Sequence, residues 1–229
     1  MVLKSFGLTH VQYDNSDKLG FLCALLSLSP VFIIIVYGTI IATRRDFQTV
    51  YSCIGQLISV MVNIFLKHTL KEPRPGFHNH YLDKSVDNAL ESEYGMPSNH
   101  AQFMFHFATY YSLQLLFRSW SLPSKYRVLY SFGLLLVASL VSYSRVRLHY
   151  HTVAQVVVGD CVGFITGLIW YIVSITSTEL SIVICRQKWA EWLCIRDYSG
   201  KIGSYPPVDE YIMFKAYQKQ QAVEAKKIS

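Results

Sequence analysis

Long runs of apolar residues alternate with short polar stretches along the chain. Each run is close to the ~20 residues that a membrane-spanning helix needs, and its apolar character continues around every helical face. The pattern therefore predicts membrane helices rather than the one-sided helices of a soluble domain. The predicted spans are roughly 19–42, 48–66, 100–117, 128–143 and 153–175.

A sixth segment, 178–195, is more polar and contains Trp189 and Trp192 among charged residues. We interpret it as lying in the membrane interface, and a poor span is the alternative. The predicted fold is all-α, a polytopic membrane helical bundle of about five to six helices. We divide the chain into an N-terminal non-cytosolic segment (1–18), a membrane domain (19–195) and a C-terminal tail (196–229).

The composition supports a membrane protein. Hydrophobic residues make up 52% of the chain and charged residues 16%, whereas soluble domains carry about 25% charged residues. The formal net charge is +6. Because the basic residues form no long patch interleaved with aromatic side chains, nucleic acid is not an expected partner.

Basic residues also predict the orientation of the bundle. Cytosolic loops are enriched in Lys and Arg, so we assign the side that carries most of them to the cytosol. The last residues include Lys226-Lys227, which resemble the dilysine retrieval signal of endoplasmic-reticulum membrane proteins; a frayed charged end is the alternative. The basic groups on this side are Arg44 and Arg45, then Arg118, Lys125 and Arg127, then Arg186 and Lys188.

Three polar clusters lie on the opposite, non-cytosolic side, at residues 67–75, 97–100 and 144–151. They contribute the cations Lys67, Arg74 and Arg145. Arg offers a planar fork of donors to phosphate oxygens, and Lys acts as a point charge. Each cation alone is also typical of a side chain that reaches the membrane interface. Three of them beside histidines indicate a site for a multiply charged anion.

Two histidines in these clusters suit acid–base and nucleophilic chemistry. His100 follows Ser98 and Asn99 at the predicted start of a helix, where free backbone N–H groups bind anions. His151 precedes Gln155 by four residues, so the two share a helical face. The Gln155 oxygen can accept a hydrogen bond from one ring nitrogen and leave the other nucleophilic. The set needs no metal and no cofactor.

Three further residues are candidates for contacts to a second phosphate group. Lys71 and Arg147 add positive charge near the clusters, and His149 adds an imidazole two residues before His151. For His149, local packing is the alternative.

The spacing of the clusters resembles a known signature. Lys67-x6-Arg74-Pro75, Pro97-Ser98-x-His100 and Ser144-Arg145-x5-His151 are similar to the three-part motif of the type 2 phosphatidic-acid phosphatase (PAP2) superfamily, which is related to vanadium haloperoxidases. Within it, the chain most resembles the dolichyl diphosphatases. The similar segments are residues 71–75, 94–97, 101–104, 150–152 with Gln155, and 195–197.

The resemblance implies a role for each motif residue. His151 would attack the terminal phosphorus and become phosphorylated. His100 would protonate the leaving oxygen and later activate water. The residues that would bind the phosphoryl oxygens are Lys67, Arg74, Ser98, Asn99 (through its backbone) and Arg145.

The resemblance also implies a reaction and a location. The expected activity is hydrolysis of dolichyl diphosphate to dolichyl phosphate on the lumenal face of the endoplasmic reticulum, which recycles the carrier lipid for N-glycosylation. The expected partners are this polyprenyl lipid and the bilayer, with no obligate protein partner. A phosphatase for phosphatidate or a sphingoid-base phosphate is an alternative activity.

One residue departs from the superfamily pattern. Four residues after the nucleophile the superfamily usually has Asp, and this chain has Gln155. Loss of the acid in a comparable triad costs about 10⁴ in rate, so an inactive membrane scaffold is a further alternative. The resembling dolichyl diphosphatases also carry Gln, and a diphosphate releases a phosphate monoester, which leaves more easily than an alkoxide.

Overall fold

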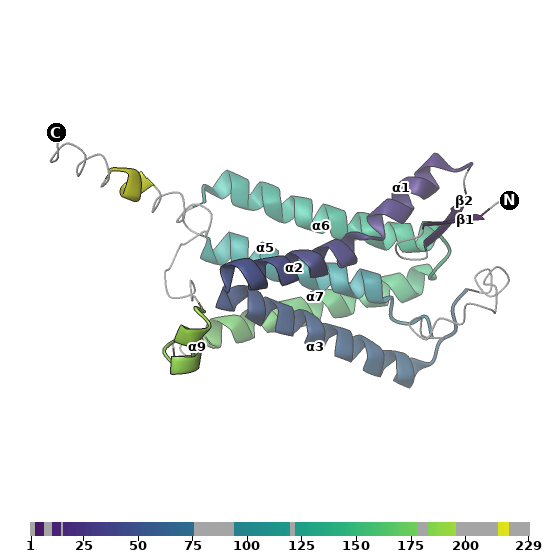
Figure 1. The fold of residues 1–229 in the computed structure, drawn as a ribbon. Helices are drawn as coiled ribbons and strands as arrows, with labels where there is room; N and C mark the ends of the chain where they lie inside the picture. Colours follow the sequence, from purple (N-terminus) through teal and green to yellow (C-terminus); the bar gives the residue numbers. More distant parts are fainter. Residues whose placement is uncertain are drawn as a thin grey trace.

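A computed structural model describes residues 3–6, 11–14, 16–75, 94–119, 122–177, 183–195 and 215–219. Within these residues the predicted helical bundle is confirmed, and a short antiparallel hairpin precedes it (Figure 1). The strands are β1 (Leu3–Phe6) and β2 (Val11–Asp14). The helices are α1 (Lys18–Leu26), α2 (Ser29–Arg44), α3 (Phe47–Leu70), α5 (Asn99–Arg118), α6 (Ser124–Arg147), α7 (Val153–Thr176) and α9 (Lys188–Trp192).

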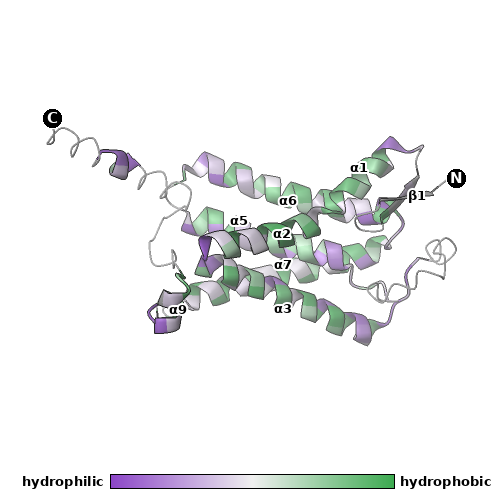
Figure 2. Ribbon diagram, viewed as in Figure 1, coloured by the Kyte–Doolittle hydropathy of each residue, from purple (hydrophilic) through white to green (hydrophobic). Residues whose placement is uncertain are grey.

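Every predicted span is helical. Four helical stretches of the described chain are long and apolar enough to cross a membrane: Lys18–Arg44, Phe47–Leu70, Ser124–Arg147 and Val153–Thr176. Helix α5 is more polar, but its 20 residues extend about 30 Å, the thickness of a bilayer core. Large apolar side chains such as Phe65 and Met61 are exposed on the outer faces, and hydrophobic residues predominate along the helices in Figure 2. The protein is a multi-pass membrane protein.

The first predicted span is one apolar run in the sequence but two helices in the structure. Helix α1 ends before Ser27, whose buried hydroxyl donates to the carbonyl of Cys23 at 3.0 Å. Helix α2 then starts with Pro30 in its first turn, where the missing N–H costs nothing because that group has no helical partner. The break brings Ser27 to the interior, where its hydroxyl lies 3.2 Å from that of Ser144.

Helix α5 is the centre of the bundle and packs against α7, α6, α3 and α2. Its closest neighbour is α7, which presents Gly159, Gly163 and Gly167 at intervals of four residues. A Cβ added at these positions would collide with the backbone oxygens of Ser98, Gln102 and His106, which lie in α5 or directly before it. Small residues at this spacing let two membrane helices approach closely, and the approach fixes the start of α5 beside the start of α7.

Buried polar side chains join α3 to α5. Asn63 donates to the side-chain oxygen of Gln102 at 2.8 Å, and Gln102 donates to the carbonyl of Ser59 at 2.6 Å. Asn63 also donates to the carbonyl of Pro97 at 3.3 Å. Hydrogen bonds between membrane helices stabilise their association, so this seam holds the end of α3 against the segment that begins α5.

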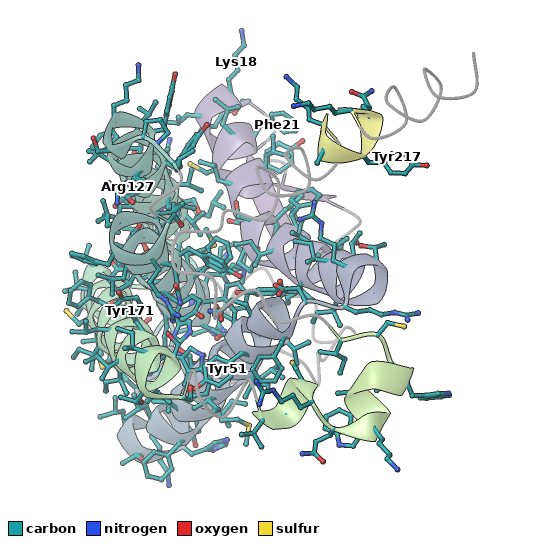
Figure 3. The ribbon with its side chains drawn as sticks, turned by 90° about the vertical axis from the view of Figure 1, so that its left-hand side faces the viewer. Lys18, Phe21, Tyr51, Arg127, Tyr171 and Tyr217 are labelled. Carbon is teal, nitrogen blue, oxygen red and sulfur yellow. The ribbon has the colours of Figure 1, made fainter. Side chains whose placement is uncertain are left out.

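The two ends of the bundle carry different features. The hairpin lies at one end, where Val11 packs with Ala24 and Tyr150, and α9 lies at the other (Figure 1). Figure 3 looks along the bundle from the α9 end, with Arg127 marking α6 and Tyr51 marking α3.

The segment 178–195 is described from residue 183 onward. It contains α9, whose five residues are too few to cross a membrane. Trp192 is 81% exposed, and Arg45 of the loop after α2 donates to the carbonyl of Leu193 at 3.1 Å. These features favour the interfacial interpretation. Lys226-Lys227 lies outside the described residues.

Candidate active site

The three predicted clusters meet at the hairpin end of the bundle (Figure 1). The first cluster ends α3, the second begins α5, and the third spans the end of α6 and the short loop into α7. The predicted cations and histidines therefore come from the ends of α3, α5 and α6 and from the loops that follow α3 and α6.

The first and second clusters are joined through their backbones. Helix α3 stops where Lys71 adopts φ 51°, and the chain after it pairs with the segment before α5. Pro73 forms a β-bridge with Tyr94, and the N–H of Gly95 donates to the carbonyl of Glu72 at 2.7 Å. The buried ammonium of Lys67 donates to the carbonyl of Tyr94 at 3.0 Å. This pairing fixes Lys67 and the following segment relative to the start of α5.

Arg145 organises the third cluster. Its side chain is 2% exposed; its guanidinium stacks 4.0 Å from the ring centroid of Tyr150 and donates to the hydroxyl of Ser27 at 3.3 Å. Its carbonyl accepts the N–H groups of Tyr150 and His151 at 3.0 and 3.3 Å. Arg145 thus contributes a buried positive charge to the site, and its carbonyl fixes the backbone of His151.

His151 is oriented by Gln155 as its spacing predicts. The ring Nδ1 lies 3.2 Å from Gln155 Oε1. That oxygen also accepts the N–H of Thr152 at 3.2 Å, while the amide nitrogen donates to Glu72 Oε1 and to the carbonyl of Pro73 at 3.0 and 2.9 Å. These partners fix which end of the amide is oxygen. Nδ1 therefore carries the proton, and Nε2 of the neutral ring keeps its lone pair.

The site is strongly positive around both histidines. The charges of Arg145, Arg74 and Lys67 act on the imidazoles of His100 and His151 alike. His100 also forms a hydrogen bond with the backbone of Ser27. Burial first and these cations second lower the pKa of His151 well below its ordinary 6.5, and the hydrogen bond to Gln155 opposes them. The His151 ring is therefore neutral at neutral pH.

Ser98 and Asn99 begin α5 without using the Ser98 hydroxyl as a cap. The Ser98 Oγ is buried with no hydrogen-bond partner in the described part of the chain, and its N–H donates to the carbonyl of Gln155 at 3.0 Å. Asn99 is the exposed first residue of the helix. A buried hydroxyl without a partner is costly, and a phosphate oxygen would satisfy it.

The candidates for a second phosphate all lie at the same end of the bundle. Lys71 and His149 are exposed, and His149 adopts φ 58° in the loop before α7. Arg147 forms an ion pair with Asp17 at 2.6 Å and is 40% exposed. Their role in binding a second phosphate stays a prediction.

Glu72 is the neighbour that sequence reasoning missed. Glu72 belongs to one of the segments that resemble the dolichyl diphosphatases, but the sequence predicts no role for it. In the structure its carboxylate accepts a hydrogen bond from the amide nitrogen of Gln155. Spacing in the sequence gives no sign of this contact, because it depends on how the chain bends after α3.

Comparisons with known proteins agree with the fold. A model of the PAP2 superfamily matches residues 48–179. The human protein named dolichyldiphosphatase 1 is 39% identical over 199 residues, 84% of this chain and 81% of that protein. Its mouse counterpart is 38% identical over the same shares. A solved structure, the transmembrane PAP2 type phosphatidylglycerolphosphate phosphatase from Bacillus subtilis, has a TM-score of 0.55 at 18% identity and covers 69% of this chain and 77% of that one.

The fold and the family match define a membrane-embedded phosphatase. The chain belongs to the PAP2 superfamily and, within it, to the dolichyldiphosphatase group.

Proposed function

We propose that the protein hydrolyses dolichyl diphosphate to dolichyl phosphate and phosphate through a phosphohistidine intermediate. The observation that carries the proposal is the placement of two buried or half-buried histidines in the field of Lys67, Arg74 and Arg145, in a chain whose relatives bear the name dolichyldiphosphatase.

The mechanism assigns His151 as nucleophile. Its Nε2 attacks the terminal phosphorus while Nδ1–H stays bonded to Gln155 Oε1, and the leaving phosphate oxygen departs with the bonding pair. The negative charge of the bound diphosphate offsets the neighbouring cations, so His100 can carry a proton in the complex. His100 gives that proton to the leaving oxygen and later takes one from the water that cleaves the phosphohistidine. The cations, the Ser98 hydroxyl and the Asn99 backbone stabilise the charge on the transferring phosphoryl group. Such electrostatic stabilisation usually accounts for most of the rate acceleration in phosphoryl transfer.

The second phosphate distinguishes this substrate from a monoester. Lys71 and His149 are exposed, Arg147 is 40% exposed, and the three are the proposed contacts for the phosphate that stays on the lipid. The leaving group is then itself a phosphate, which separates from phosphorus more readily than an alkoxide.

The proposed location is the endoplasmic-reticulum membrane with the site on the lumenal face, where the product would re-enter the carrier pool for N-glycosylation. The basic residues Arg44, Arg45, Arg118 and Arg127 support this orientation. They lie at helix ends opposite the site, and Lys and Arg favour the cytosolic side. The C-terminal tail is then cytosolic.

A substrate panel tests the activity. Purified protein in detergent should release phosphate from dolichyl diphosphate with a kcat/KM at least about tenfold above that for phosphatidate or a sphingoid-base phosphate, since only the diphosphate offers the second phosphate and the better leaving group. EDTA should leave the rate unchanged. A preference for phosphatidate, or loss of activity on chelation, would contradict the proposal.

The pH dependence of the reaction reports the state of His151. Because burial and neighbouring cations lower its pKa from 6.5, protonation needs more acid than usual, so the nucleophile is lost only as the pH falls well below 6.5. The acid limb of kcat/KM, which reports the free enzyme, is expected there. Diethyl pyrocarbonate, which acylates neutral imidazole, should inactivate the substrate-free protein with the same pH dependence. An acid limb above 6.5 in both measurements would overturn the assignment.

A further inference from the structure

A carboxylate lies one amide away from the proposed nucleophile. Glu72 Oε1 accepts a hydrogen bond from Gln155 Nε2 at 3.0 Å, and Gln155 Oε1 lies 3.2 Å from His151 Nδ1. The three side chains form a continuous line from carboxylate through amide to imidazole. The superfamily pattern places Asp at position 155, so this chain carries its acid on a different element.

The geometry of this line is fixed on both sides. Gln155 is fully buried and its amide has partners at each end. Gly95 leaves the room it needs, since a Cβ there would lie 2.6 Å from the amide. The backbone carbonyl of Glu72 accepts from Gly95 N–H at 2.7 Å, so Glu72 is anchored to the segment that begins α5 and is not a freely moving surface side chain.

We propose that Glu72 is a positioning residue that supplies, through Gln155, the negative charge needed beside His151. The inference rests on the proposed function, in which His151 Nε2 bonds to phosphorus. As that bond forms and the leaving oxygen departs with its electron pair, the ring gains positive charge. Nδ1 keeps its proton and strengthens its bond to Gln155 Oε1. The amide, polarised by its charge-assisted bond to Glu72, accepts more strongly.

The surroundings make such a charge necessary. Lys67 and Arg74 of the first cluster and Arg145 of α6 act on His151, and His100 of α5 lies in the same field. These cations bind the phosphoryl oxygens but oppose a second positive charge on the ring. Glu72 is the acidic group that the described residues place in hydrogen-bond contact with the oriented amide.

The chain of contacts from Glu72 through Gln155 to His151, called the relay below, also gives a reason for glutamine at position 155. A carboxylate there would turn an oxygen toward Glu72 and toward the carbonyl of Pro73, both acceptors, at the distances of 3.0 and 2.9 Å now spanned by N–H donors. Acceptors at that distance repel each other. An acid at one of the two positions therefore requires an amide at the other.

Glu72→Gln tests the charge, because it keeps the size of the side chain and an oxygen that can still accept from Gln155. The expected result is a kcat lower by about 10–100-fold, the range found for groups that orient a functional histidine, with KM within about threefold. The acid limb of kcat/KM should move to lower pH, since a ring without the carboxylate protonates less readily. A purely structural role would leave the limb in place.

Asp160→Asn is the matched control. Asp160 is an acid of α7 whose carboxylate accepts from the Ser142 hydroxyl at 2.6 Å, and asparagine keeps an oxygen that can accept this bond. No hydrogen bond joins Asp160 to Glu72, Gln155 or His151 in the described residues, so the rate should stay within about threefold. Thermal unfolding of both variants separates a loss of stability from a loss of rate.

Exchanging the two residues provides the rescue. Gln155→Glu alone sets two carboxylates against each other and should lose more activity than Glu72→Gln. The double variant Glu72→Gln/Gln155→Glu keeps one charge and one amide, and it should be at least about tenfold faster than Gln155→Glu alone. Wild-type kcat in Glu72→Gln, or a double variant no faster than Gln155→Glu, would overturn the relay.

His151→Ala tests the proposed function separately: an inactive His151→Ala beside a fully active Glu72→Gln would overturn the relay alone.

Discussion

Replacement of His151 by alanine is expected to lower phosphate release from dolichyl diphosphate by about 10⁴-fold or more, as loss of a nucleophile does in other covalent enzymes. The variant lacks the nitrogen that attacks phosphorus. In the wild-type protein Gln155 Oε1 lies 3.2 Å from the protonated Nδ1, which leaves Nε2 as the attacking atom. The acid-labile phosphoenzyme trapped from labelled substrate should disappear. The measurement combines steady-state phosphate release with rapid quenching at alkaline pH, where phosphohistidine survives.

His68→Ala is the control for this variant. His68 lies in the last turn of α3 at the same end of the bundle, is exposed, and contacts the ring of Tyr94 edge-on with centroids 6.0 Å apart. Its loss should leave the rate within about threefold, in the range of surface substitutions. His151→Gln keeps most of the buried volume and separates chemistry from packing. Either His151 variant with near-normal turnover, or with an intact phosphoenzyme, would show that the nucleophile lies elsewhere.

Replacement of His100 separates acid–base catalysis from nucleophilic attack by His151. His100→Ala removes the proposed donor to the leaving oxygen and the base for water, but not the nucleophile. Because water attack on the phosphohistidine then lacks its base, the phosphoenzyme should accumulate while turnover falls. A His100 variant that forms no phosphoenzyme at all would contradict the separation of roles.

The spans were predictable because their apolar residues continue around the helix, but their ends were not. Helix α6 was predicted over 128–143 and extends from Ser124 to Arg147, since Lys and Arg at a membrane edge lower the hydropathy of a sequence without ending the helix. The split of the first span carried a signal in Pro30, which suits the first turn of a helix. The two strands at 3–6 and 11–14 had no such signal in the apolar pattern.

The contacts of the site also fall into those that the sequence predicts and those that it does not. The pairing of His151 with Gln155 follows from a four-residue spacing on one helix, which is local geometry. The contact of Glu72 with Gln155 joins positions 83 residues apart, and it depends on the bend at Lys71 and the bridge between Pro73 and Tyr94. The stacking of Arg145 on Tyr150 likewise needs the turn at His149. Such contacts follow from tertiary structure, and one sequence does not reveal them.

Replacement of Arg145 by methionine is expected to lower kcat/KM by about 10²–10³-fold, the loss found when one donor to a developing negative charge is removed. Methionine keeps the apolar stem against Tyr150 but removes the buried guanidinium. Arg127→Met is the matched control. Arg127 lies in the first turn of the same helix, at the opposite end from Arg145, and donates to the carbonyl of Leu116 at 2.9 Å. Its effect on the rate should therefore stay below about fivefold.

Arg145→Lys and chemical rescue distinguish charge from shape. Lysine keeps the charge but loses the planar fork, so it should recover part of the rate and leave a deficit of about tenfold. In Arg145→Ala, millimolar guanidinium should restore activity in a saturable manner, because the cation can occupy the space beside Tyr150. If Arg145→Met retained the full rate with unchanged thermal stability, the guanidinium would serve only to hold the loop that carries His151. The phosphoryl group would then be bound by Lys67 and Arg74 without it.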